Sequence, residues 1–192
     1  PSHYSVINIL EKLVNIRGVH LLDDGWDFKN FENILSLEKI DLVYVTPNFH
    51  DPSGICWSEN KKMYLLELAE KFDFYIIEED NYSPLSYSEK YLSFKSLERI
   101  GKERIFYIRD FSTLLGSFLG LTCVIVPPKL KDKFLMEKIA FSIVPSQVQQ
   151  NMLETFINNG YFFFFLNKLK NVLNNRLNYL VNELKNIAEL KI

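Results

Sequence analysis

The chain has 192 residues, a formal net charge of −2 and 47% hydrophobic residues, which is enough for one domain with a substantial core. The near-neutral charge gives no electrostatic reason to expect nucleic-acid binding by this segment. No apolar run approaches the roughly 20 residues that a membrane helix needs, and the N-terminus lacks the basic and apolar regions of a signal peptide.

Hydrophobic periodicity predicts strands that alternate with helices in the first two thirds of the chain. Asp27 and Ser58 are the expected N-caps of two helices, because each precedes an apolar helical pattern. The expected elements are a helix over residues 1–17, a strand over 19–22, a turn over 23–25, a helix over 28–37, a strand over 42–45, a helix over 59–72 and strands over 74–77, 105–108 and 121–126. From Leu130 onward the pattern predicts helices, with a break at Pro145-Ser146 or Asn159-Gly160.

This alternation predicts a largely parallel sheet that helices cover on both faces. Ligands of such sheets bind outside the carboxyl ends of the strands. Three polar turns leave strand ends here, at residues 46–54, 78–84 and 110–116. We therefore expect the three turns to converge on one site, whose chemistry the pattern alone does not name.

Short, specific sequence motifs lie in and beside these turns. Residues 44–54 read Tyr-Val-Thr-Pro-Asn-Phe-His-Asp-Pro-Ser-Gly, residues 65–69 read Leu-Leu-Glu-Leu-Ala, and residues 79–82 read Glu-Asp-Asn-Tyr. In order and spacing they resemble the fold-type I pyridoxal-phosphate (PLP) aminotransferases, and most of all the aminotransferase-like domain of MocR-type regulators of the GntR superfamily. The resemblance covers essentially the whole chain. It implies an α/β fold, namely the large domain of a PLP-dependent transferase (aminotransferase class I/II). This domain would have a mainly parallel sheet sandwiched by helices, and it would be incomplete in this chain.

The same resemblance implies a vestigial cofactor site of four residues. Asp80 matches the aspartate that pairs with the pyridinium nitrogen of the cofactor. Tyr82 matches a tyrosine near the phenolic oxygen, and Asp51 stands where aminotransferases carry an asparagine on that oxygen. Ser112 lies in the turn that resembles the family's Ser/Thr-x-Ser-Lys pattern. The competing interpretation of Asp80 is an ordinary solvated loop acid.

The departures from the family lie in and just after the third turn. Thr113 stands at the position of the lysine that forms the Schiff base, so the resemblance implies no catalytic residue. Asp110 replaces a hydroxyl that binds the cofactor phosphate, and a carboxylate there would repel a dianion. Gly120 replaces the arginine that clamps the phosphate. We therefore expect no cofactor to bind, although PLP serves the relatives.

These observations favour a non-catalytic effector-sensing and dimerisation domain of a GntR/MocR-type transcriptional regulator. Residues 1–192 would form a partial large domain, whose C-terminal helices, from about 130 to 192, lead toward an absent small domain. The implied partners are a second copy of the chain and a small-molecule effector (an amino acid or a vitamer), with DNA contacted only through an absent N-terminal domain and no membrane. The alternatives are a fragment of a PLP-dependent aminotransferase acting on an amino acid and 2-oxo acid pair, and a structural remnant that pairs with a homologous subunit.

Several other side chains favour the plainer of two interpretations. Cys56 and Cys123 lack metal-ligand spacing, so we expect no metal, and two free thiols predict a cytoplasmic protein. His50 could act as a proton shuttle, but a histidine satisfied within its turn is commoner. The aromatic block Tyr161–Phe165 could be a partner patch or core packing. Because four successive Phe side chains must point in several directions, at least one should meet the small domain or a partner subunit.

Overall fold

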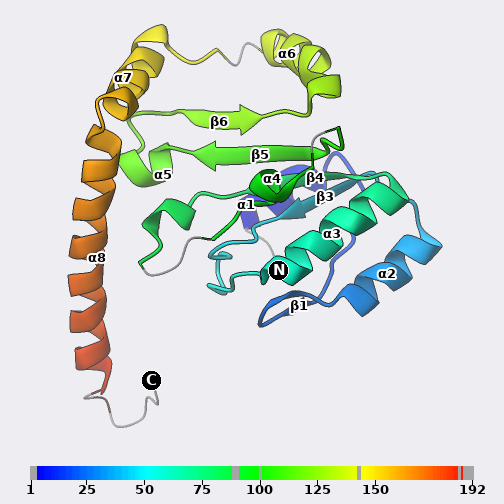
Figure 1. Cartoon of the computed structure of the whole chain (residues 1–192), viewed down its shortest axis with the longest axis horizontal. Helices are drawn as coiled ribbons and strands as arrows, with labels where there is room; N and C mark the ends of the chain where they lie inside the picture. Colours follow the sequence, from blue (N-terminus) through cyan, green and yellow to red (C-terminus); the bar gives the residue numbers. More distant parts are fainter. Residues whose placement is uncertain (1–3, 88–90, 100, 142–143, 186, 188–192) are drawn as a thin grey trace. The chain divides into compact units, whose positions relative to one another are not determined.

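The computed structural model describes residues 4–87, 91–99, 101–141, 144–185 and 187 (Figure 1). They fall into two compact units. The first runs to residue 83 and resumes from 91 to 144, and the second comprises residues 84–87 and the described residues from 145 onward.

The first unit is built on a four-stranded mixed sheet with strand order β3-β4-β5-β6 (Figure 1). Its strands are β3 (Leu42–Val45), β4 (Tyr75–Glu79), β5 (Ile105–Asp110) and β6 (Thr122–Ile125). The first three pair in parallel, which confirms the predicted parallel sheet, whereas β6 runs antiparallel to β5. Residues 111–121 join β5 to β6 and are too few for the crossover of a dozen or more residues that a parallel pair requires. The antiparallel strand follows from this short connection.

Helices flank this sheet on both faces. The core packs α2 (Phe28–Leu37) and α3 (Glu59–Phe72) against alternate residues of β3 and β4, because successive strand residues point to opposite faces. On the opposite face, Phe106 of β5 contacts Phe134 of α6 (Lys131–Ala140) with ring centroids 6.4 Å apart. The buried core cluster is Phe31, Leu35, Val43, Val45, Trp57, Leu65, Leu68, Ala69, Phe74, Ile76, Phe94 and Ile105.

Both predicted N-caps are confirmed. The Asp27 carboxylate accepts a hydrogen bond from the Asn30 backbone N–H at 3.2 Å, and α2 begins at the next residue. The Ser58 hydroxyl accepts one from the Lys61 backbone N–H at 3.4 Å, and α3 begins at the next residue. These bonds satisfy backbone donors that the first turn of a helix leaves without an intrahelical partner.

The N-terminal segment differs from its prediction. Helix α1 (Tyr4–Leu10) ends well before Arg17, and none of its residues is buried, so no packing stabilises further turns. Residues 1–3 of the predicted helix lie outside the described residues. β1 (Leu21–Leu22) and β2 (Gly25–Trp26) form a separate antiparallel hairpin. The last residue of the turn predicted over residues 23–25 is therefore the first residue of β2.

Short helices interrupt the connections after β4 and around β5. They are the 3-10 turns η1 (Ser83–Leu85) and η2 (Pro128–Leu130) and the four-residue helices α4 (Phe94–Leu97) and α5 (Ser112–Leu115). The sequence pattern predicted no helix in these connections. A helix of four residues is shorter than the periodicity that reveals a helix in a sequence.

The second unit contains α7 (Gln147–Asn158) and α8 (Tyr161–Lys185). Both predicted break points lie outside helices, since Pro145-Ser146 directly precedes α7 and Asn159-Gly160 separates α7 from α8. Phe156 of α7 lies within 6.5 Å, between ring centroids, of Tyr161, Phe162 and Phe165 of α8. Phe164 is 71% exposed, so the aromatic block divides between packed and exposed side chains, as four successive aromatic residues on a helix must. Within the described residues, no helix is both long and apolar enough to cross a membrane.

Candidate functional site

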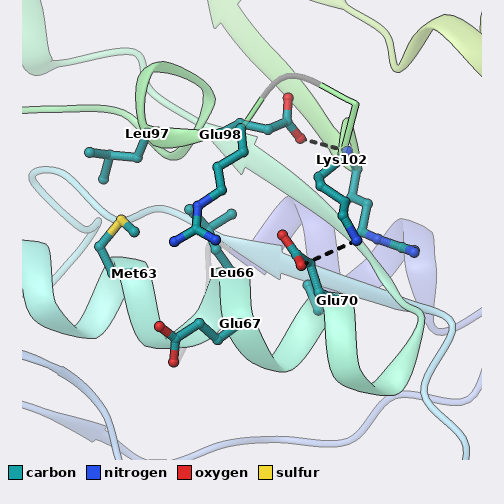
Figure 2. A pocket seen from close by; sticks show the side chains of 10 residues that line it. Met63, Leu66, Glu67, Glu70, Leu97, Glu98 and Lys102 are labelled. Carbon is teal, nitrogen blue, oxygen red and sulfur yellow. Dashed lines mark hydrogen bonds and ion pairs between the residues drawn. The ribbon is translucent and has the colours of Figure 1, made fainter.

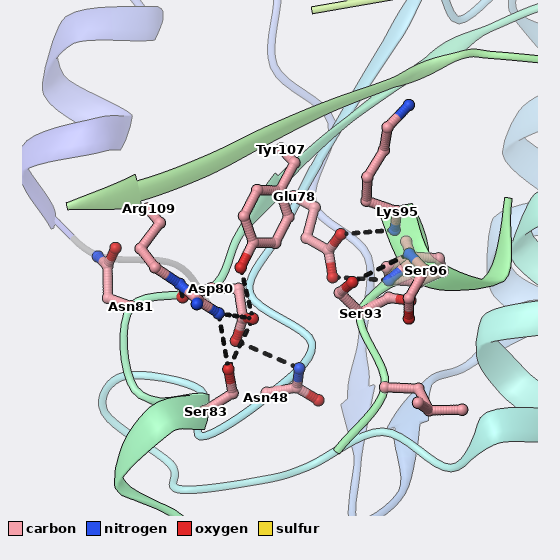
Figure 3. Close-up of polar contacts among 12 residues, drawn as sticks. Asn48, Glu78, Asp80, Asn81, Ser83, Ser93, Lys95, Ser96, Tyr107 and Arg109 are labelled. Carbon is pink, nitrogen blue, oxygen red and sulfur yellow. Dashed lines mark hydrogen bonds and ion pairs between the residues drawn. The ribbon is translucent and has the colours of Figure 1, made fainter. Parts of the chain in front are cut away.

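The three polar turns converge at the carboxyl edge of the parallel strands, as predicted (Figure 3). Asn48 of the first turn donates from Nδ2 to Asp80 Oδ1 of the second at 3.3 Å. Asn81 of the second turn accepts from the Asp110 backbone N–H, at the start of the third, at 2.8 Å. Arg109, the residue before this turn, bonds to Asp80 at 2.8 Å. Side chains far apart in the sequence therefore form one polar cluster.

Asp80 lies at the centre of this cluster and is 1% exposed. Its Oδ2 accepts hydrogen bonds from Ser83 Oγ at 2.7 Å, Tyr107 Oη at 3.0 Å and Arg109 Nη2 at 2.8 Å. Arg109 also donates from Nε to the Asp80 backbone carbonyl at 3.1 Å. Tyr107 and Arg109 are two residues apart on β5, so both side chains reach the same face of the sheet. A buried carboxylate is thereby neutralised and hydrogen-bonded within the chain.

Asp110 organises the third turn. Its Oδ1 accepts from the Ser112 backbone N–H at 2.9 Å and from Thr122 Oγ1 at 3.3 Å. Its Oδ2 accepts from Thr113 Oγ1 at 3.2 Å. The Thr113 hydroxyl, at the position where the resemblance predicts a lysine, therefore donates to a neighbouring carboxylate. Ser112 meets the same carboxylate through its backbone.

Lys62 is a buried cation that the sequence analysis missed. It is 1% exposed, and its Nζ donates to Asn48 Oδ1 and to the Leu92 backbone carbonyl, both at 2.7 Å. Burial lowers the pKa of Lys62, and the charges of Glu78 and Asp80 oppose that shift. The spacing of Lys62 from Leu65 and Ala69 places it on the buried stripe of α3, and this signal could have found it.

Glu78 is a second buried charge that the sequence analysis did not single out. It is fully buried, and its two carboxyl oxygens accept the backbone N–H groups of Phe94 at 2.7 Å and Lys95 at 2.9 Å (Figure 3). Burial raises the pKa of Glu78 to about 7, although the two backbone N–H groups lower it. These bonds hold the first turn of α4 against the end of β4.

The remaining predicted residues lie at the rim of the cluster. Tyr82 is half-buried, and its pKa is raised by burial first and then by the charges of Asp51, Glu79 and Asp110. Asp51 itself is exposed. His50 is buried within its own turn, where its Nδ1 lies 2.7 Å from Ser53 Oγ. The carboxylates of Asp51, Glu79 and Asp110 therefore give the surroundings of Tyr82 a negative charge.

A shallow hollow lies elsewhere, between α3 and the segments 97–99 and 101–104 (Figure 2). Met63, Leu66 and Leu97 line it together with charged side chains, and Lys102 pairs with Glu70 across 3.5 Å. None of the sequence-predicted site residues is among those that line it. The hollow is therefore separate from the polar cluster.

The fold matches that of known proteins, although no family model matches the chain. A crystal structure of Pyrococcus horikoshii kynurenine aminotransferase, solved in complex with PMP, superposes with a TM-score of 0.88 over 96% of this chain and 47% of that one, at 23% identity. This chain has an aminotransferase-like fold. A PLP-bound C-S lyase from Staphylococcus hominis shares it, with a TM-score of 0.69 over 87% of this chain and 42% of that one, at 18% identity.

Relatives in sequence include regulators as well as enzymes. The HTH-type transcriptional regulator YcxD of Bacillus subtilis is 28% identical over 161 residues, 83% of this chain and 36% of its own length. The probable rhizopine catabolism regulatory protein MocR of Rhizobium meliloti is 28% identical over 148 residues, 77% of this chain and 29% of its own. Aromatic-amino-acid aminotransferase 1 of Thermococcus litoralis is 28% identical over 125 residues, 65% of this chain and 30% of its own. The chain thus spans less than half the length of these relatives, and the expected likeness to MocR-type regulators and aminotransferases is confirmed.

The polar cluster does not fit the PLP that such aminotransferases use. Oδ2 of Asp80, the expected partner of the pyridinium nitrogen, already accepts three donors that include the Arg109 guanidinium. Thr113 supplies no amine, and Lys62 is enclosed by its own partners. Asp110 places a carboxylate in the turn that would face a phosphate. At Gly120, φ is +56°, a backbone conformation that arginine rarely adopts.

Proposed function

We propose that this chain is a non-catalytic, aminotransferase-like domain of a GntR/MocR-type transcriptional regulator that serves in effector sensing and dimerisation. One observation carries the proposal. Asp80, the residue that should hold the cofactor ring, is paired within the chain with Arg109 at 2.8 Å. Thr113, at the position expected for the lysine, has a hydroxyl that donates to Asp110 and has no amine. A scaffold with this centre keeps the shape of an aminotransferase without its nucleophile.

The similarity to YcxD and MocR supports the proposal that this chain is part of a longer regulator. In this proposal the helices from about residue 130 lead toward a small domain, and DNA is contacted by a separate N-terminal domain. The domain pairs with a second copy and binds an amino acid or a vitamer as its effector. We also propose that the protein is cytoplasmic, because a regulator of this kind binds DNA there.

The test is a titration of the purified chain with pyridoxal phosphate, followed by visible absorbance, borohydride trapping and a transamination assay. We expect no cofactor band, no saturable adduct and no turnover. The Thr113→Lys variant should gain no transamination either, because Asp110, Gly120 and the Asp80–Arg109 pair remain. A wild-type adduct that maps to one lysine, or turnover by Thr113→Lys, would contradict the proposal.

A second candidate function is a fragment of a PLP-dependent aminotransferase acting on an amino acid and 2-oxo acid pair. The similarity to the aromatic-amino-acid aminotransferase of Thermococcus litoralis favours it. The reading frame upstream of this chain separates the two candidates. A winged helix-turn-helix there supports the regulator, whereas a phosphate-binding loop without a winged helix supports the enzyme.

A further inference from the structure

We propose that Arg109 and Asp110, adjacent residues at the end of β5, are built-in counter-charges that replace the two charged ends of the cofactor. The Arg109 guanidinium takes the place of the ring cation at Asp80, and the Asp110 carboxylate takes the place of the phosphate at the third turn. This inference rests on the proposed function, because it explains how the scaffold is complete without a cofactor.

The cation end follows from the burial of Asp80. An isolated buried carboxylate is strongly unfavourable unless a cation and hydrogen bonds accompany it. Arg109 supplies both, through Nη2 to Oδ2 at 2.8 Å and through Nε to the Asp80 carbonyl at 3.1 Å. Tyr107 fixes the guanidinium further, since the Arg109 Cζ lies 5.3 Å from the centre of the Tyr107 ring. An incoming pyridinium would have to displace the guanidinium from a carboxylate that it already neutralises.

The anion end follows from the donors of the third turn. The Ser112 N–H and the Thr113 and Thr122 hydroxyls are the kind of donors that bind a phosphate. All three point to the Asp110 carboxylate, at 2.9, 3.2 and 3.3 Å. An external phosphate would lose these donors and meet a like charge.

The two ends are tied together through Asn81. Its Oδ1 accepts the Asp110 backbone N–H at 2.8 Å, and its Nδ2 donates to Glu79 Oε1 at 2.6 Å. Asp80, the adjacent residue, carries the pair with Arg109. The positive charge of Arg109 thus pairs with the second turn, and the negative charge of Asp110 accepts the donors of the third. These contacts hold the centre in place without any ligand.

The test uses pyridoxamine 5′-phosphate, which carries its own amine and so requires no lysine for binding. Its affinity is measured by calorimetry for the full chain and for the double variant Arg109→Ala/Asp110→Thr, with circular dichroism to verify folding. We expect the double variant to bind about ten-fold more tightly than wild type, or better, a difference of about 1.4 kcal/mol. Adding Asp80→Asn to the double variant should abolish the gain.

A matched control is Arg104→Ala, which removes an arginine that is 24% exposed, as Arg109 is, but is paired with the exposed Asp73. It should leave the affinity at the wild-type level. Equal affinity of wild type and the double variant, or no binding by either when both are folded, would overturn the inference. Tight binding by wild type would also overturn it, yet would leave the proposed function standing, since that fails only on a trapped lysine or turnover.

If the double variant does not fold, Asp110→Thr alone carries the test. It leaves the Asp80–Arg109 pair in place and frees the donors of the third turn. We expect it to bind inorganic phosphate more tightly than wild type by about three-fold or more. Unchanged phosphate affinity of this variant would overturn the inference.

Discussion

Two arginines of equal exposure show how the surroundings of an ion pair decide its contribution to stability. Arg104 and Arg109 each have a side chain that is 24% exposed, and each pairs with an aspartate. The carboxylate of Asp73 is 83% exposed and retains its water, whereas that of Asp80 is 2% exposed. Removing an arginine therefore leaves a solvated anion in one case and a buried, uncompensated anion in the other.

We expect Arg109→Ala to lower the free energy of unfolding by about 3 kcal/mol, and Arg104→Ala to lower it by less than about 1 kcal/mol. Urea unfolding followed by circular dichroism measures both. Combining Arg109→Ala with Asp80→Asn should restore much of the loss, because the second change removes the stranded charge. Additive losses in the double variant would show that the two side chains do not act as a pair.

The sequence could predict Asp80 but not its partners. A motif placed Asp80 at a strand end, and alternation placed the strand in the core. Arg109 and Tyr107 reach Asp80 only because Glu79 of β4 lies opposite Ile108 of β5 in the parallel register. Turn geometry fixes the register of a hairpin, but no tight turn joins two parallel strands, so local sequence gave no guide to this register. The internal neutralisation of the site was therefore outside the reach of sequence analysis.

Glu78 gives the protein a dependence of stability on pH. Burial raises the folded-state pKa of Glu78 to about 7 from 4.5, so the folded protein binds more protons than the unfolded chain in that interval. The contribution of Glu78 is hence most favourable below pH 4.5 and falls as the pH rises toward 7. We expect a loss of up to about 3 kcal/mol across the interval.

Urea unfolding at about pH 5 and about pH 8 tests this dependence, with Glu78→Gln as the comparison. The glutamine variant should be less stable overall, because an amide nitrogen cannot accept the second backbone N–H. Its free energy of unfolding should nevertheless change less between the two pH values than that of wild type. An identical pH dependence in the two proteins would show that Glu78 does not titrate as argued.

At the scale of elements, the N-caps set where helices begin. Ser58→Ala removes the acceptor of the Lys61 N–H at the start of α3, and should cost about 1 kcal/mol. Ser36→Ala is the matched control, because Ser36 lies exposed inside α2 and its hydroxyl donates to the Asn33 carbonyl. It should be neutral or slightly stabilising, since alanine has the higher helix propensity. Thermal unfolding measures both, and equal shifts in Tm would contradict the capping argument.

The elements that sequence predicted well are those with a local cause. The caps fix the starts of α2 and α3, and Gly160 separates α7 from α8. The features that the sequence pattern did not predict depend on packing and on the length of a connection. Helix α1 stops early because it buries no residue, and β6 turns antiparallel because its connection to β5 is short.

At the scale of the whole molecule, the exposed apolar surface of α8 is the feature that its own unit leaves unexplained. Phe162 is buried and contacts Phe156 of α7, whereas Tyr161, Phe163 and Phe164 are 57%, 63% and 71% exposed. Exposed aromatic groups of this size mark surfaces that bind another protein surface. In the proposed dimerising domain, a second copy of the chain would cover them.

We therefore expect the chain to associate in a concentration-dependent way, and the double variant Phe163→Ser/Phe164→Ser to weaken that association. Burying one Phe side chain contributes about 1.5–3 kcal/mol, so the dissociation constant should rise about ten-fold or more. Sedimentation velocity over a range of concentrations measures it. Asn167→Ser/Asn171→Ser changes two exposed polar residues of the same helix and should leave the association unchanged. If the serine variant at the two Phe positions sediments like wild type, these rings take no part in self-association, and dimerisation must use another surface.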